Sequence, residues 1–115
     1  MLFRSLDVPL EDARTGAETL VHADLLGIDS HGVAHVARHP GYVPGLRGGW
    51  VKARPDVRVL RETPSTVVLD GDGGLGVAVA PRAMARAIEK AAVNGCGFAA
   101  VRERSEERRV GKECV

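Results

Sequence analysis

Three of the four histidines in the chain lie within nine residues of one another, at His31, His35 and His39. An imidazole titrates near neutral pH, so a histidine can pass a proton to or from a substrate oxygen. The neighbouring hydroxyl of Ser30 could orient the ring of His31, and the guanidinium of Arg38 could hold a substrate carboxylate. The segment therefore favours acid–base chemistry on an acidic substrate, while surface or helix-capping histidines are the simpler alternative.

The spacing of His31 and His35 would also suit a metal ion. Residues four apart share one face of a helix, and two imidazoles on one face can bind zinc. The sequence has no glutamate between them, as H-E-x-x-H zinc sites do, and no third ligand is evident nearby. We therefore expect no metal site.

A second candidate motif is glycine-rich. Residues 71–76 read GDGGLG, which fits the G-x-G-x-x-G pattern of dinucleotide-binding loops, and Glu103 ends a later apolar segment, where a ribose-binding acid is sought. Asp70 and Asp72 flank the first glycine, however, and two carboxylates oppose the approach of a pyrophosphate. The following helix is also predicted to begin late, at Pro81. We therefore favour a glycine turn that joins a strand to a helix, with a small Rossmann-type nucleotide-binding module as the alternative.

Hydrophobic periodicity predicts the elements that position these motifs. Residues 9–26 form an amphipathic helix, with Pro9 in its first turn and Gly27 as its stop. Its apolar stripe comprises Leu10, Ala13, Ala17, Leu20, Val21 and Leu25. A second short helix, capped by Ser30, ends before Pro40. The glycine- and proline-rich residues 40–55 are expected to form turns or an exposed connection.

The second half of the chain alternates between strand and helix patterns. We predict strands at 57–62, 65–70 and 96–101, and a helix at 81–93 that is ended by Asn94-Gly95. The fold class is therefore α/β in a mixed α+β arrangement, with N-terminal helices followed by a strand–glycine turn–helix–strand unit.

The totals restrict the class of protein. A chain of 115 residues forms one domain at most. Its formal net charge of +1 gives no electrostatic reason to bind nucleic acid or an anionic membrane. No apolar run approaches the ~20 residues needed to cross a bilayer. Two cysteines, Cys96 and Cys114, do not make a disulfide framework. We expect a soluble cytoplasmic protein.

The composition changes abruptly at the C-terminal end. Nine of the twelve residues in 102–113 are charged, which is typical of a solvated tail. The string RSEERRVGKEC, residues 104–114, resembles the translation of a sequencing-adapter oligonucleotide. We therefore expect residues 1–103 to be the domain and residues 104–115 to be a non-native charged tail. If the tail is native, the alternative is a non-enzymatic interaction domain that uses it for recruitment.

Residues 17–33, AETLVHADLLGIDSHGV, resemble the opening of the malate/L-lactate dehydrogenase family, which includes ureidoglycolate dehydrogenase and diketogulonate reductase. Residues 62–91 resemble the next block of that family, and GFAAVRE at 97–103 begins a third. The resemblance implies a non-Rossmann fold and a homodimeric oxidoreductase. Such an enzyme transfers a hydride between NAD or NADP and a small 2-hydroxy or 2-oxo acid. It also implies that the chain is an incomplete N-terminal fragment, inactive alone and poorly soluble or molten when isolated.

The resemblance also assigns roles to individual residues. The family's histidine in S-H-G matches His31, as proton donor to the substrate carbonyl oxygen, and Ser30 is its relay partner. Many members carry an arginine four residues later to grip the substrate carboxylate, where this chain has His35. We expect His35 and Arg38 to take over substrate binding. Cofactor-binding residues stay unassigned, because most of them lie further downstream in the family.

Overall fold

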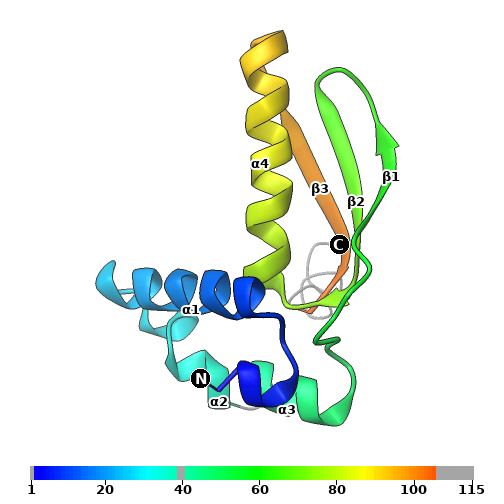
Figure 1. Ribbon diagram of the computed structural model, residues 1–115. Helices are drawn as coiled ribbons and strands as arrows, with labels where there is room; N and C mark the ends of the chain where they lie inside the picture. Colours follow the sequence, from blue (N-terminus) through cyan, green and yellow to red (C-terminus); the bar gives the residue numbers. More distant parts are fainter. Residues whose placement is uncertain (1, 39–40, 106–115) are drawn as a thin grey trace, which may run out of the picture.

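The computed structural model describes residues 2–38 and 41–105 and has two parts that meet in an L shape (Figure 1). A long helix and a three-stranded sheet form the upright part, and the N-terminal helices form the base. The elements in chain order are η1 (Arg4–Leu6), α1 (Leu10–Leu25), η2 (Asp29–His31), α2 (Ala34–Ala37), α3 (Tyr42–Gly48), β1 (Arg58–Glu62), β2 (Thr66–Gly74), α4 (Gly76–Asn94) and β3 (Phe98–Arg104). The predicted mixed class, with helices first and a strand–helix–strand unit second, is confirmed.

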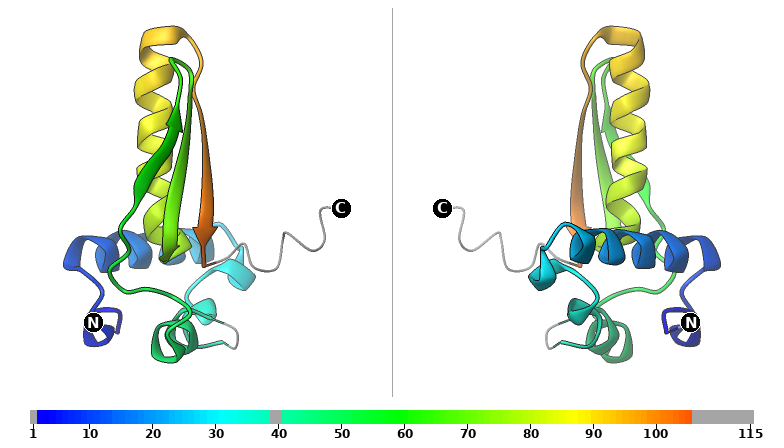
Figure 2. Two further views of the ribbon diagram at one scale, coloured as in Figure 1. Left: turned by 90° about the vertical axis from the view of Figure 1, so that its right-hand side faces the viewer. Right: turned by 90° about the vertical axis from the view of Figure 1, so that its left-hand side faces the viewer.

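The sheet has the order β1-β2-β3. β1 and β2 pair antiparallel, and β2 and β3 pair parallel through the crossover helix α4. Figure 2 shows the three strands as one layer against α4, with α1 to α3 below them. Val67 and Leu69 of β2 pack with Ala83 of α4 in a small core, whereas Val68 between them is less buried. This alternation is the period of a strand with one covered face.

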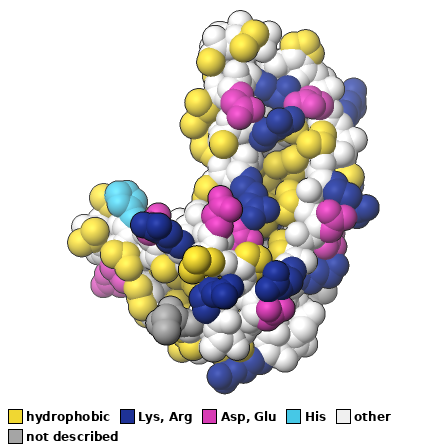
Figure 3. All heavy atoms as spheres, viewed as in Figure 1, with side chains coloured by type: hydrophobic (Ala, Val, Ile, Leu, Met, Phe, Trp, Pro, Cys, Tyr) yellow, Lys and Arg dark blue, Asp and Glu magenta, His cyan; other side chains and the backbone are white. Residues whose placement is uncertain are grey.

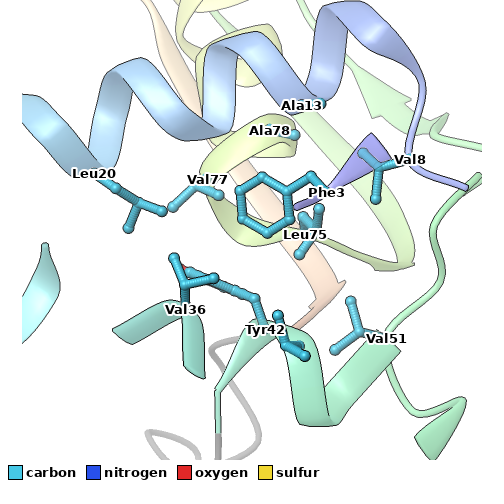
Figure 4. Packing of buried hydrophobic residues seen from close by; sticks show 11 residues of the cluster. Phe3, Val8, Ala13, Leu20, Val36, Tyr42, Val51, Leu75, Val77 and Ala78 are labelled. Carbon is cyan, nitrogen blue, oxygen red and sulfur yellow. The ribbon is translucent and has the colours of Figure 1, made fainter. Parts of the chain in front are cut away.

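A second and larger core fills the base, where α1, the start of α4 and α3 meet (Figure 4). Its centre holds Phe3, whose ring packs edge-on against Tyr42 at a centroid distance of 6.2 Å. Small aliphatic side chains surround this pair, among them Val8, Leu20 and Val77, which are 8% exposed or less. The base and the upright part are joined because Leu75, Val77 and Ala78, at and just before the start of α4, belong to this core.

Helix α1 has the predicted length but not the predicted buried face. Leu10 and Leu25 are 68% and 79% exposed, whereas Leu20 and Ala13 are buried. The reason is Gly16, which is buried and leaves room for Val77 of α4, since a Cβ there would lie 3.2 Å from the valine Cγ2. Because α1 contacts α4 through Gly16, the face of α1 that packs in the core is not the apolar stripe that includes Leu10 and Leu25.

The expectation that residues 40–55 form only turns and an exposed connection is wrong. Residues 42–48 form helix α3, in which Tyr42, Val43 and Gly45 are buried. Pro44 is tolerated because it lies in the first turn, where backbone N–H groups have no partner within the helix. A Cβ at Gly45 would press against the side chains of Val51 and Trp50, and a Cβ at Gly48 would press against the Trp50 ring. These glycines serve close packing and not chain flexibility.

The boundaries of the strand–helix–strand unit also differ from the prediction. β2 continues through Gly74, and α4 begins at Gly76, so Pro81 is its sixth residue and not part of its first turn. The carbonyl of Leu75 accepts the N–H groups of Ala78 and Val79 and starts the helix. Its end is as predicted, because Gly95 has a left-handed φ of 79° after Asn94. Within residues 2–38 and 41–105, no helix is long and apolar enough to cross a membrane.

Candidate functional site

The Ser30–His31 segment lies at the C-terminal end of α1. Gly27, at φ 75°, turns the chain out of the helix, and the N–H of Ile28 returns to the carbonyl of Ala23. The chain then forms the single turn η2 and passes through Gly32 into α2. The predicted capping of a second helix by Ser30 is wrong, because Ser30 lies inside η2 and α2 begins only after Val33.

Ser30 and His31 form a side-chain pair. Ser30 Oγ lies 2.8 Å from His31 Nδ1, and both side chains are exposed. When the ring is charged, its Nδ1–H donates to the serine oxygen. The other ring nitrogen, Nε2, is then left to exchange a proton with a molecule in solution. The contact is one that could orient the ring, and the acid–base role of His31 stays a prediction.

His35 does not share a helix face with His31. His31 ends η2, whereas His35 is in α2, and Gly32 between them is extended at φ −91° and ψ −155°. The His35 ring instead packs edge-on against Tyr42 at a centroid distance of 5.0 Å, which fixes α2 to the core of the base. Among the residues that the structure describes, no three His, Cys, Asp or Glu side chains cluster as metal ligands would.

Arg38 follows α2 directly and is exposed. It lies three residues beyond His35, on the same short stretch that leads away from the His31 segment. His39 is outside the described residues. The substrate-binding roles of His35 and Arg38 therefore stay predictions.

The glycine segment does not form a dinucleotide loop. Gly71, Asp72 and Gly74 belong to β2, and the N-terminal residues of α4 are buried against the base. The N–H of Gly76, which a phosphate would need, donates to Ser105 Oγ at 3.0 Å. The Rossmann-type alternative is therefore wrong. The helix does not begin late at Pro81, as predicted, but at Gly76. Its buried start excludes a bound pyrophosphate there.

The two aspartates of this segment serve the fold. Asp72 Oδ1 forms an ion pair with Lys52 Nζ at 2.5 Å, and Asp72 Oδ2 accepts the N–H of Asp56 at 2.9 Å. These contacts, the Lys52 hydrogen bond first, hold the pKa of Asp72 below its ordinary value. Asp70 Oδ1 in turn accepts the N–H of Asp72. Asp72 thus ties β2 to the stretch before β1, and Asp70 lies 3.6 Å from the Arg58 guanidinium of β1.

An apolar surface surrounds the His31 segment. Leu25, Leu26, Ile28 and Val33 are between 47% and 79% exposed. Figure 3 shows hydrophobic side chains gathered over this end of α1, at the left of the view. A proton donor beside such a surface can work in a site from which water is excluded, once that surface is covered.

One residue of the site was missed by the sequence analysis. Asp24, in the last turn of α1, accepts the N–H of Val33 at its Oδ2, over 3.0 Å. The family resemblance at residues 17–33 includes Asp24, Gly27 and His31 at this spacing, but the residue types alone indicate no role for Asp24. An aspartate near a helix end was not distinguishable by pattern from a solvated charge.

The fold is part of the fold seen in solved malate/lactate dehydrogenase-like structures. The sequence pattern of the malate/L-lactate dehydrogenase family matches residues 1–112, and the chain belongs to that family. It is 46% identical over 97 residues to the malate dehydrogenase of Pyrococcus abyssi and 42% identical over 101 residues to the L-sulfolactate dehydrogenase of Methanocaldococcus jannaschii. These alignments cover 84% and 88% of this chain.

The solved structures agree. The malate dehydrogenase of Pyrococcus horikoshii superposes with a TM-score of 0.81 at 46% identity, over 86% of this chain. The chain spans only about a quarter to a third of its relatives, covering 26% and 28% of the two enzymes above and 28% of this structure. The described fold therefore corresponds to one part of these longer proteins.

Proposed function

We propose that the complete subunit carrying this segment is an NAD(P)-dependent dehydrogenase of a small 2-hydroxy acid, and that His31 is its proton donor. The observation that carries the proposal is the 2.8 Å contact between Ser30 Oγ and His31 Nδ1, on an exposed turn in a chain of this family. The pair orients one imidazole and leaves its second nitrogen for the substrate.

The chemistry of this chain is the proton half of the reaction. A bound nicotinamide supplies the hydride in the reducing direction. The His31 imidazolium would donate its Nε2 proton to the substrate carbonyl oxygen, where negative charge develops during reduction. Nδ1–H keeps its hydrogen bond to Ser30 throughout. Because His31 is exposed, Nε2 can then regain a proton from water, while Ser30 keeps the ring oriented.

The substrate class follows from the relatives and from the basic groups near the site. Malate and sulfolactate, after which the relatives are named, are 2-hydroxy acids with a second anionic group. We assign the substrate carboxylate to Arg38, which can bind it with two parallel hydrogen bonds. His35 is assigned a supporting part, because its ring is already packed against Tyr42.

The described residues do not fit a nicotinamide cofactor at the glycine segment. The first residues of α4 are buried against the base, so the helix start is not open to a pyrophosphate. We therefore assign no cofactor contact to this chain and place those contacts in the remaining length of the subunit. The proposal extends, on family resemblance alone, to a cytoplasmic homodimer, and to a fragment that is inactive by itself.

The test is substitution of His31 in a complete subunit. His31→Ala and His31→Gln should each lower kcat by roughly two to four orders of magnitude, the usual contribution of a general acid. The matched control is His22→Gln, because His22 is exposed on α1 and outside the segment. His22→Gln should leave kcat unchanged. A His31→Ala subunit with native kcat would refute the proposal.

A further inference from the structure

We propose that Asp24 is a positioning residue for His31, an inference that rests on the proposed function of that histidine. Asp24 is half-buried in the last turn of α1. Its Oδ2 accepts the backbone N–H of Val33, nine residues later, over 3.0 Å. The aspartate thereby links the helix to the chain on the far side of the Ser30–His31 pair.

Gly32 gives independent support. This glycine has φ −91°, a value open to any residue, so its backbone conformation does not require glycine. It is nevertheless buried, and a Cβ at position 32 would overlap the carboxylate of Asp24. The glycine that follows the histidine is therefore needed because the Asp24 carboxylate occupies the space of a side chain.

The contacts of the segment explain why such a link matters. The backbone of η2 is held from one side, where the N–H of His31 donates to Ile28 and that of Gly32 to Asp29. The His31 ring is exposed and takes its orientation from Ser30, within the same turn. The Asp24–Val33 hydrogen bond holds the segment from the other side. Since a displacement of about 1 Å at a reacting group can cost ~100-fold in rate, a fixed backbone here is a catalytic requirement.

The first test compares Asp24→Ala with Asp24→Asn in a complete subunit. Alanine removes the acceptor for the Val33 N–H, and kcat should fall about 10- to 100-fold with KM changed by less than about threefold. Asparagine retains an oxygen that can accept this N–H, so it should keep kcat within about threefold of the native value. The control is Glu18→Ala on the same helix, where an exposed pair with Arg14 is lost.

Two outcomes would overturn the proposal. One is an Asp24→Ala subunit with native kcat, and the other is an asparagine variant as impaired as the alanine variant. Amide hydrogen exchange of residues 29–36 gives a readout independent of catalysis. It should be faster in Asp24→Ala than in the native subunit, whether or not His31 is the acid. Loss of activity in His31→Ala together with unchanged exchange in Asp24→Ala would refute only the positioning role.

Gly32→Ala tests the same contact while leaving the aspartate in place. We expect Gly32→Ala alone to lower kcat about 10-fold or more, because the added methyl displaces the Asp24 carboxylate. In the Asp24→Ala background the same change should cost almost nothing further, since the space is then free. Such strong non-additivity is the mark of two residues in direct contact. Additive losses would contradict the contact and the proposal with it.

Discussion

Ser30 Oγ and His31 Nδ1 lie 2.8 Å apart although the two residues are adjacent in sequence and both are exposed. Both residues lie in the single 3₁₀ turn Asp29–His31, so the contact is made within one turn. An exposed hydrogen bond of this kind adds little to stability. Its value lies in fixing which ring nitrogen carries the exchangeable proton.

Ser30→Ala should therefore impair catalysis and spare the fold. We expect kcat of a complete subunit to fall about 10- to 100-fold, less than for loss of the histidine itself, because an unoriented imidazole still transfers protons. Tm should be unchanged. Ser30→Thr retains the hydroxyl and should keep most of the activity. If alanine and threonine were equally impaired, the hydroxyl would not be the relevant group.

A second prediction concerns the ion pair between Asp12 of α1 and Arg82 of α4. Asp12 is 6% exposed, whereas the Arg82 side chain is 48% exposed. Arg82→Ala leaves a buried carboxylate without its partner and should lower the free energy of unfolding by about 2–3 kcal/mol. Asp12→Ala leaves only an arginine that can turn to solvent, so it should cost about 1–2 kcal/mol.

Urea denaturation of the complete subunit would measure this asymmetry. The matched control is Arg14→Ala, which breaks the exposed Arg14–Glu18 pair at 3.0 Å and should cost less than about 1 kcal/mol. Equal losses from Arg82→Ala and Arg14→Ala would show that the burial of Asp12 has no energetic consequence.

The sequence predicted most of the elements but not how two of them pack. Strands were found within a few residues, because the alternation of Val67 and Leu69 reflects one covered face. The face of α1 was missed because burial at Gly16 depends on Val77 of another helix. α3 was missed because Gly45 and Gly48 read as turn residues in the sequence. They are needed instead for packing against the side chains of Trp50 and Val51, which the sequence pattern does not show.

The candidate site divides in the same way. Ser30 and His31 are neighbours in sequence, so their pairing could be predicted from a short motif. Asp24 accepts the backbone N–H of Val33. Every residue type except proline carries such an N–H, so the contact could not be predicted from the residue at position 33. His35 was expected beside His31, but Gly32 breaks the helix that this expectation assumed.

A third prediction is a pH dependence that arises from Asp72. The Lys52 hydrogen bond, with that of the Asp56 N–H, lowers the pKa of Asp72 from its ordinary 3.8. A carboxyl whose pKa is lower in the folded state stabilises that state above pH 3.8. The contribution is lost as the pH falls through the folded-state pKa, which lies below 3.8. Asp72→Asn should therefore be less stable than the native subunit at pH 6 but closer to it at pH 3.

Denaturant midpoints at the two pH values would check this. Asparagine is a suitable replacement because residue 72 has φ 48°, a left-handed conformation that asparagine adopts readily. Glu89→Gln is the control, since Glu89 is exposed and its nitrogen partner on Arg86 is 3.8 Å away. A deficit of the Asp72→Asn variant that does not change between pH 6 and pH 3 would contradict the assignment.

The last prediction concerns the 115-residue chain expressed alone. Phe98 of β3 and Ile88 of α4 are 65% and 61% exposed, and Leu60 of β1 is 50% exposed. β1 and β3 form the two edges of the described sheet, and uncovered edges with apolar side chains promote association. We expect the isolated chain to self-associate in sedimentation velocity experiments and to bind the dye ANS.

Phe98→Lys and Ile88→Lys should each reduce both signals, because they remove apolar area as well as add charge. Ala92→Lys adds the same charge at another exposed site on α4 and should reduce them less. A monomeric chain with a sharp cooperative melt and no dye binding would show instead that these faces are stable in water, so that the segment folds independently of the rest of its subunit.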